Sequence, residues 1–374
     1  MMYGEEKARE EALKVMEYVR PVIEEFFAVR DSYVSSYRGY YTPVFEVELT
    51  PLSKQGFLKL VAHVKPLGLA PILREEDGIY KLMLAKVPVR KVKRRRWVII
   101  GLLIATLATV TYSGYQQAVT LKELLSSLGI KINPYLNASL YTVGVMLIIG
   151  LHELAHKFAS KRHGLRASPP YFIPGPPLPF GLGTFGAVIL QEDLPPNRES
   201  LFDIGISGPI ASFILSIIIG FVGVILSYPV PASVALEWQK AGKAAPLPRC
   251  LLLEVMLYLI PRPKGTVLIL HPLAFAGWLG FFITALNLLP VSPLDGGKVA
   301  RAVFGDKYRL PLIIAALAVA ILMGAQLMVL LLLFFVLFAY EPPPLDMVSK
   351  LDKKRKIIAA LVPLMIAFSI PRWW

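Results

Sequence analysis

Long apolar stretches separated by short polar ones dominate the chain from residue 97 onward. Runs at 97–112, 138–158, 204–226 and 270–289 carry few charges, and further apolar runs cover 310–340 and 357–370. A hydrocarbon layer about 30 Å thick needs roughly 20 mostly apolar residues per helix, and several of these runs reach that length. The pattern predicts an all-α multi-pass membrane protein with about six transmembrane helices, divided into a core at 90–300 and C-terminal helices at 301–374.

The first 89 residues follow a different pattern. Residues 5–29 have helical periodicity and mixed charge, and an aromatic, turn-rich linker follows Tyr33. Residues 44–49 alternate as a strand does, 54–64 have helical spacing, and 72–74 and 79–84 flank an acidic hairpin turn that ends in Asp77-Gly78. We expect a small α+β domain at 1–89 with the order α-β-α-β-β. Because no cluster of polar residues there resembles a site, its predicted role is docking or regulation.

A stretch rich in Pro and Gly, residues 164–200, separates the second apolar run from the third. It cannot form a continuous helix. Its apolar character nevertheless predicts a membrane-associated, β-like loop, because irregular backbone is tolerated at membrane depth only beside protein or a cavity. The segment with strand character is Gly183, Thr184, Phe185, Gly186, Ala187, Val188 and Ile189.

The net charge of +14 is placed beside the apolar runs. Basic residues at 90–96 precede the first run, and Lys157, Lys161, Arg162 and Arg166 follow the second. Such placement predicts cytoplasmic flanks that meet the lipid bilayer rather than nucleic acid, and it makes the N-terminal domain cytoplasmic. Cys250 is the only cysteine, so an intrachain disulfide and a Cys-rich metal site are both excluded.

The topology of the last third is ambiguous in the sequence. One tilted span over 310–340 would place the basic cluster at 350–356 outside the cell, against the positive-inside tendency. Two short spans broken near Gly324 would return this cluster to the cytoplasm. We favour the single span, because each half alone is too short to cross the hydrocarbon layer.

Chemistry is concentrated in His152-Glu153-Leu-Ala-His156, inside the second apolar run. Residues four apart share one face of a helix, so both imidazoles can reach one metal ion while Glu153 lies beside its open position. Catalytic zinc takes three protein ligands and a water, and Glu153 would act on that water as general base. The alternative is a structural polar cluster packed between helices.

The third ligand predicted is Asp295. It follows the fourth run at the same membrane side as the HExxH end, whereas His63, His163 and His271 lie in the soluble domain, at the surface and on the outer side. Prolines 290 and 293 should end the preceding helix, and the glycines 296 and 297 should let the backbone turn Asp295 inward. The alternative is that Asp295 only caps the next helix.

Together these motifs resemble the site-2 protease family of intramembrane zinc metalloproteases. The resemblance rests on HExxH, on the pattern NxxPxxxxDG from Asn287 to Gly296, and on Gly208 with Ser212 as a GxxxS motif. The segments at 183–189, 196–198 and 271–278 are similar to the archaeal and chloroplast branch. The similarity covers residues 140–300 most closely.

The resemblance implies zinc held by His152, His156 and Asp295, with Glu153 as catalytic base. Asn287 would bind substrate backbone or the oxyanion, or else make an interhelical hydrogen bond. The small residues Gly208 and Ser212 would allow close helix packing. The expected activity is regulated intramembrane proteolysis of single-span membrane protein substrates, in the cell membrane, with the active site towards the cytoplasm.

An unwound substrate could add as a strand to the edge at 183–189, although this segment could also serve only as a plug. Two other functions would fit a membrane protein with these residues. A cation transporter would need several intramembrane carboxylates and inverted repeats, and the chain shows neither. An inactive binding protein would not need the intact ligand set and base. The sequence predicts no oligomeric state.

Overall fold

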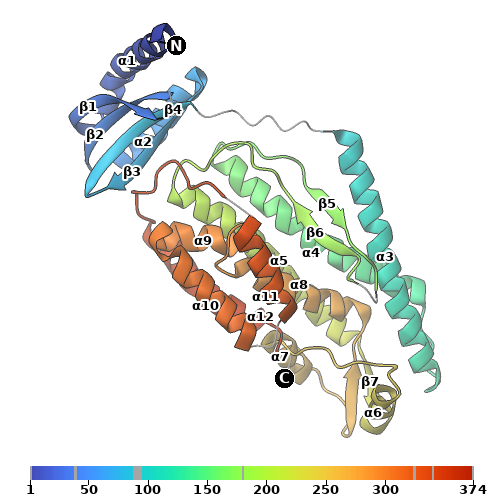
Figure 1. Ribbon diagram of the computed structural model, residues 1–374. Helices are drawn as coiled ribbons and strands as arrows, with labels where there is room; N and C mark the ends of the chain where they lie inside the picture. Colours follow the sequence, from blue (N-terminus) through green and yellow to red (C-terminus); the bar gives the residue numbers. More distant parts are fainter. Residues whose placement is uncertain are drawn as a thin grey trace. The chain divides into compact units, whose positions relative to one another are not determined.

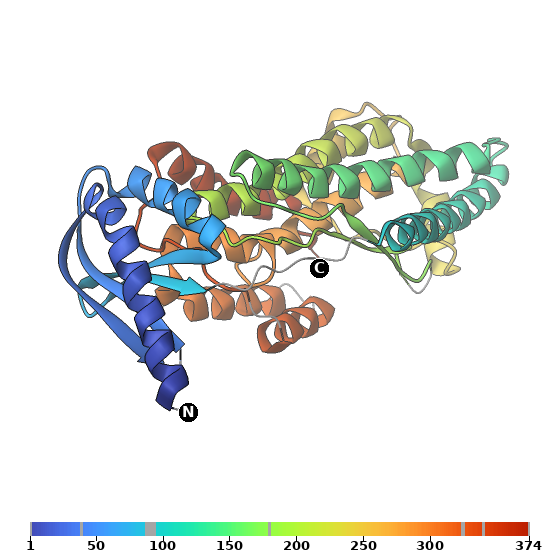
Figure 2. The ribbon, with the colours of Figure 1, turned by 90° about the horizontal axis from the view of Figure 1, so that it is seen from above.

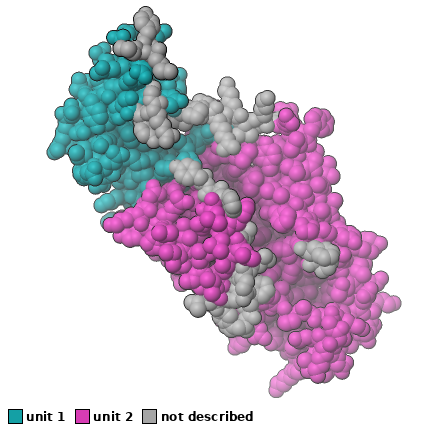
Figure 3. All heavy atoms as spheres, in the orientation of Figure 1, with its two compact units in different colours: residues 1–91, 192–201, 342–353 teal, residues 92–191, 202–341, 354–374 magenta. Residues whose placement is uncertain are grey.

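The computed structural model describes residues 2–37, 40–86, 95–178, 181–322, 326–338 and 341–372, which divide into two compact units (Figure 3). Unit 1 comprises 1–91, 192–201 and 342–353, and unit 2 comprises 92–191, 202–341 and 354–374. Most of the basic run at 90–96, and also Gly324, lie outside the described residues.

Unit 1 is built on a four-stranded antiparallel sheet covered on one face by two helices. The sheet has the order β1-β2-β4-β3, with β1 (Phe27–Tyr37), β2 (Tyr40–Leu49), β3 (Leu69–Glu76) and β4 (Ile79–Lys86) (Figure 1). The helices α1 (Met2–Glu24) and α2 (Ser53–Val64) bury their apolar sides in one cluster with alternate residues of the strands. The predicted α+β character of the N-terminal region is therefore confirmed. The core of this cluster includes Val19, Ile23, Phe45, Val47, Phe57, Leu60, Leu82 and Leu84.

The predicted order of elements in this region is wrong at β1. The helix ends at Glu24 instead of continuing to residue 29, and the supposed linker is a strand that pairs with β2 from Phe27↔Leu49 to Tyr37↔Tyr40. An edge strand exposed over most of its length needs few apolar residues, so its alternation is weak. The β3–β4 hairpin is confirmed, with positive φ at Asp77 and Gly78 as a tight primed turn requires.

Two later segments complete the sheet of unit 1 at the β3 edge. The Leu73 N–H donates to the Leu345 carbonyl at 2.9 Å, and Met347 N–H donates to the Leu73 carbonyl at 3.3 Å. On the other side of this segment, Leu345 N–H donates to Pro195 O at 2.9 Å. Leu345 is also buried in the unit 1 core. Unit 1 therefore contains more than the first 89 residues.

Unit 2 is mostly helical, and three of its described helices are long and apolar enough to cross a membrane. These are α3 (Arg96–Ser126), α4 (Pro134–Arg162) and α5 (Arg198–Ile225), whose first residues belong to unit 1. The helix α8 (Pro272–Leu288) is apolar but has only 17 residues. The membrane-protein class predicted from the sequence is thus supported, but three candidate spans do not establish the predicted six.

Small residues let α5 and α8 approach each other closely. A side chain at Gly277 would overlap with the backbone of Gly220, and one at Gly223 would overlap with the backbone of Ala274. Contacts of this kind replace the hydrophobic driving force that is missing between helices in lipid. The helix α4 packs against α8, and α3 packs along α4 (Figure 2). These contacts fix the position of α8 beside the helices that carry the site.

Two small antiparallel sheets interrupt the helices. In the Pro- and Gly-rich stretch, β5 (Tyr171–Pro174) pairs with β6 (Thr184–Val188), so the predicted β-like segment forms a strand. The second sheet pairs β7 (Tyr228–Pro231) with β8 (Thr266–Ile269) and was not predicted. Between these two strands the chain forms α6 (Ala232–Lys240) and α7 (Leu251–Leu259).

The favoured single span over 310–340 is wrong. The structure has two helices there, α10 (Arg309–Leu322) and α11 (Gln326–Phe338), and their apolar faces pack together and against the segment before α9 (Asp295–Phe304). The final helix is α12 (Lys353–Ser369). Its Arg355 donates to both carboxylate oxygens of Asp203 at the start of α5, at 2.7 and 2.6 Å. The basic first turn of α12 therefore lies beside α5 at Asp203.

Candidate active site

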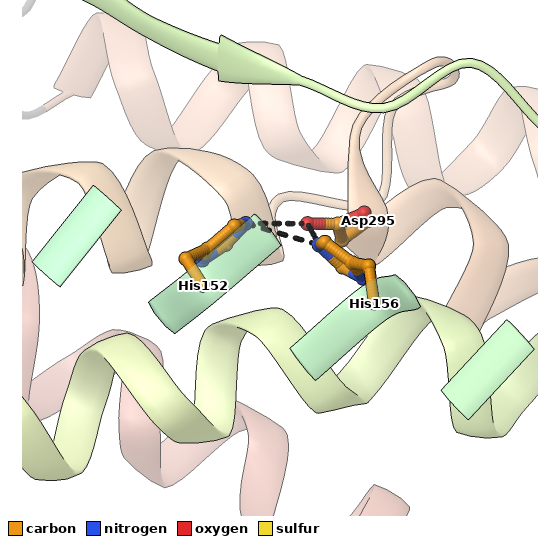
Figure 4. Close-up of side chains that lie close together, drawn as sticks. All are labelled: His152, His156 and Asp295. Atoms are coloured by element: carbon orange, nitrogen blue, oxygen red, sulfur yellow. Dashed lines mark hydrogen bonds and ion pairs between the residues drawn. The ribbon is translucent and has the colours of Figure 1, made fainter. Parts of the chain in front are cut away.

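Three buried side chains from two helices meet at one point (Figure 4). The Nε2 atoms of His152 and His156 are 3.0 Å apart, and Asp295 Oδ2 lies 3.3 and 3.0 Å from them, respectively. Each side chain is less than a tenth exposed. The helix α4 supplies both imidazoles because positions four apart share one face. The structure thus brings together the three residues that the sequence singles out as metal ligands.

Asp295 is the first residue of α9, after a turn that follows the end of α8. The two glycines after it do not have the positive φ that a special turn would need. Instead, a side chain at Gly296 would overlap with the Leu288 carbonyl, and a Cβ at Gly297 would lie 2.7 Å from Ser292 N. The glycines therefore let α9 pack closely on the end of α8, which differs from the turning role predicted for them.

Each histidine is held through Nδ1 by α5. His156 Nδ1 lies 2.6 Å from the Ile204 carbonyl, which can only accept, so this nitrogen carries the proton. His152 Nδ1 lies 3.2 Å from Ser212 Oγ. Both Nε2 atoms are then left with a free electron pair that points towards the Asp295 carboxylate. Ser212 thus has a direct contact with the site, beyond the helix packing predicted for it.

The tautomer of His152 follows from a chain of hydroxyl groups. Thr284 Oγ1 donates to the Gly280 carbonyl at 2.8 Å and lies 2.9 Å from Ser212 Oγ. Thr284 uses its proton on this carbonyl, and the single Ser212 proton can go to Thr284 Oγ1 or to the Pro209 carbonyl at 3.2 Å. In either case Ser212 accepts from His152 Nδ1–H. Thr284 was not identified from the sequence. Its signal, one hydroxyl in an apolar run a turn before Asn287, is too common to be noticed alone.

Gly208 provides the space beside the two imidazoles. A side chain there would overlap with the His156 ring, and its Cβ would lie 2.8 Å from His152 Nε2. Gly208 thus allows close packing, as predicted, and the groups that pack against it are the two histidine rings.

The three atoms that meet in this group are suited to binding a cation. With the proton of each imidazole on Nδ1, the two Nε2 atoms and Asp295 Oδ2 each offer an electron pair to the same point, and these atoms lie 3.0–3.3 Å apart. A tetrahedral zinc ion bonded at about 2.0–2.1 Å holds its ligand atoms about 3.3 Å apart. Two histidines and one carboxylate are also a ligand set of catalytic zinc sites. The residues present fit a zinc ion.

Glu153 and Asn287 have different surroundings. Glu153 is buried next to the ligand pair, and its carboxylate accepts a hydrogen bond from the Ile189 backbone N–H. Asn287 lies half-buried in the last turn of α8, and no hydrogen bond joins its side chain to another described residue. The Glu153 carboxylate is therefore close to the end of β6, whereas the Asn287 amide has no hydrogen-bond partner within the described part of the chain.

The other histidines lie outside the group. His163 caps α4, and its Nε2 lies 2.8 Å from Asp203 Oδ2, the oxygen that also pairs with Arg355. It is therefore partly buried rather than the surface residue predicted. His271 caps α8 and lies 3.0 Å from Asn137 Oδ1 in a buried pair.

Comparison with known proteins points to one family. The model described as Peptidase family M50 matches residues 140–331, about half of the chain. The protein named "Probable zinc metalloprotease EGY1, chloroplastic" from Oryza sativa subsp. japonica is 36% identical over 174 residues, which cover 46% of this chain and 29% of the relative. Its Arabidopsis thaliana counterpart is 29% identical over 257 residues, 64% of this chain and 44% of the relative.

A third relative, "Probable zinc metalloprotease EGY2, chloroplastic" from Arabidopsis thaliana, is 32% identical over 167 residues, 43% of this chain and 28% of the relative. The chain thus spans less than half the length of these curated relatives. No solved structure matches the chain.

Proposed function

Because this chain belongs to peptidase family M50, we propose that it is a zinc metalloprotease that hydrolyses peptide bonds within or near the transmembrane segments of other membrane proteins. The observation that carries the proposal is the buried contact of two unprotonated imidazole nitrogens with a carboxylate oxygen. His152, His156 and Asp295 would hold the zinc ion. Their position on α4 and α9, beside helices long enough to cross a membrane, supports cleavage at membrane depth.

Zinc, when bound, supplies the Lewis-acid chemistry that makes water nucleophilic at neutral pH. Glu153 takes the proton from the attacking water and passes it to the nitrogen of the leaving amine. The Asn287 amide donates to the carbonyl oxygen as negative charge develops on it. Its side chain is suited to this role because it has no other hydrogen bond among the described residues. The alternative role, an interhelical hydrogen bond, has no support in the described contacts.

Among the described strands β6 pairs only with β5, and its other edge is the proposed substrate-binding edge. Leu190 faces the β5 side, because its carbonyl accepts from Ser168 N–H at 3.0 Å, whereas Ile189 N–H faces Glu153. Successive peptide groups of a strand point to opposite edges. We therefore expect Ala187 N–H to share the edge that leads to Glu153, and Val188 N–H to face β5. An unwound substrate strand added at this edge would run towards the catalytic base.

The substrates proposed are single-span membrane proteins. A helical segment protects its own peptide bonds, so it must unwind before hydrolysis, and an edge with free main-chain donors provides new partners for it. We also propose that unit 1 and the active-site end of α4 lie on the cytoplasmic side of the cell membrane. The basic residues after the HExxH helix support this orientation, including Lys157, Lys161 and Arg162.

The test uses the full chain, purified and reconstituted in lipid vesicles. Metal analysis should give one zinc ion per chain, and a set of single-span membrane proteins should contain at least one that is cleaved. E153Q should keep zinc and lose cleavage by roughly 10²–10⁴-fold, because only proton transfer is removed. D295A should lose zinc, whereas H163A and H271A should keep it. Undiminished cleavage by E153Q, or full zinc in D295A, would contradict the proposal.

A further inference from the structure

Lys298 lies one helical turn after Asp295 on α9 and binds the carboxylate oxygen that faces away from the histidines. Its Nζ is 3.1 Å from Asp295 Oδ1, whereas Oδ2 is the atom that contacts both imidazole nitrogens. The lysine side chain is 19% exposed and that of Asp295 is 9% exposed. The two oxygens of Asp295 therefore have separate partners.

The fold makes room for this lysine. On α5, a Cβ at Gly205 would lie 2.9 Å from Lys298 Cβ and 3.0 Å from the Asp295 carbonyl oxygen. Gly205 lies one turn before Gly208, which provides the space beside the histidines. The same face of α5 is thus shaped around both the imidazole pair and the Lys298 stem. A lysine that merely covered apolar surface would extend its charge to water and would not need such a space.

The ammonium group is stabilised by negative charge. Besides Asp295, the carboxylates of Glu341, after α11, and of Glu153 act on its charge. A buried ammonium is costly unless it is paired and hydrogen-bonded, and here Asp295 Oδ1 provides both. The pair is directional, because Lys298 reaches only one of the two oxygens.

We propose that Lys298 is a positioning residue that restricts Asp295 to a single metal-binding oxygen. The inference rests on the proposed zinc site. A carboxylate with two free oxygens can bind a metal ion through both, which would fill the position that catalytic zinc sites keep open. By holding Oδ1, Lys298 leaves Oδ2 as the only oxygen of Asp295 available to the ion. Partners that hydrogen-bond to a metal ligand in this way typically change metal affinity 10–100-fold when they are removed.

The test compares the purified full chain with K298M, K298R and the matched control K161M. Lys161 is exposed in the last turn of α4 and carries the same charge. Zinc affinity is measured by competition with a chelator. Coordination is followed by the visible absorption of the Co²⁺-substituted protein, which weakens as the coordination number rises. K298M should bind zinc roughly 10–100-fold more weakly and give a weaker Co²⁺ absorption. K298R should retain most of the zinc affinity and most of the Co²⁺ absorption, and K161M should match the wild type in both measurements.

Wild-type zinc affinity together with an unchanged Co²⁺ spectrum in K298M would overturn the inference and leave the zinc site intact. If K298M does not purify in a folded form, K298Q takes its place, since the shorter amide does not reach Asp295 Oδ1; wild-type affinity in that variant would be equally decisive. Failure of the proposed function has a different signature, which is a wild-type protein without zinc or a D295A variant that retains it.

Discussion

Gly208 is the residue on which the space around the two histidines depends. We expect G208A to bind zinc at least 10-fold more weakly and to lose a similar factor in cleavage. The reason is that the new methyl group would overlap with the His156 ring and lie 2.8 Å from His152 Nε2, so both imidazoles must move. Metal analysis after dialysis against a chelator, together with cleavage of a single-span substrate, measures both effects.

Gly220 on the same helix provides the matched control. A Cβ there meets no atom closer than 3.5 Å, which is an ordinary contact, so G220A should keep zinc and cleavage. Equal zinc affinity in G208A and G220A would show that the imidazoles adjust without cost, and the packing argument for Gly208 would fail.

The sequence alone predicts which side chains meet in the site, but it does not predict which residues orient them. His152 and His156 could be paired because helical periodicity alone places them on one face. Ser212 and Thr284 come from two other helices, and their contact depends on how α5 crosses α8. Such a crossing is set by tertiary packing, which one sequence does not specify. For the same reason the Asp203 partner of His163 could not be predicted.

Among the elements, β6 gives the most specific prediction. A187P should reduce cleavage of transmembrane substrates at least 10-fold while leaving zinc content unchanged, because it removes an N–H that we expect on the same edge as Ile189 N–H, which binds Glu153. V188P should instead weaken the pairing with β5 and loosen the hairpin, since its N–H is expected on the other edge. Cleavage assays and metal analysis distinguish the two effects from damage to the site.

The controls A187S and V188A keep the backbone donors, so both should cleave nearly as fast as the wild type. Intact cleavage by A187P would mean that the segment only shields the site, and that the helices hold the substrate.

Sequence patterns predicted the long elements better than the short ones. The helices α4 and α5 follow from apolar length, and the β3–β4 hairpin follows from its Asp-Gly turn. Apolar length alone could not distinguish one helix from the α10–α11 pair, because both are apolar on all sides. The strands β7 and β8 have four residues each, too few for alternation to be recognised.

Considering the whole molecule, unit 1 depends on residues far along the chain. L345D should lower the free energy of unfolding of unit 1 by about 3 kcal/mol or more, because it places a charge in a core position that is 5% exposed. Hydrogen exchange should show faster exchange of the β3 and β4 amides, since the edge beside Leu73 would lose its neighbour.

Leu67 offers the matched control, because it lies in the same unit and is 49% exposed. L67D should therefore leave the exchange of these amides nearly unchanged. If the β3 and β4 amides exchange at the same rate in L345D and L67D, the segment at 342–353 does not stabilise the sheet of unit 1.

The contribution of residues 342–353 to this sheet also affects the order in which the protein can be completed during synthesis. The first 91 residues leave the ribosome long before residue 345, and at roughly 5–20 residues per second the delay is tens of seconds. During that time the β3 edge lacks its neighbours and presents unpaired peptide groups to other nascent chains or to chaperones. The unit that is made first is thus completed only after the helices of the site have been synthesised.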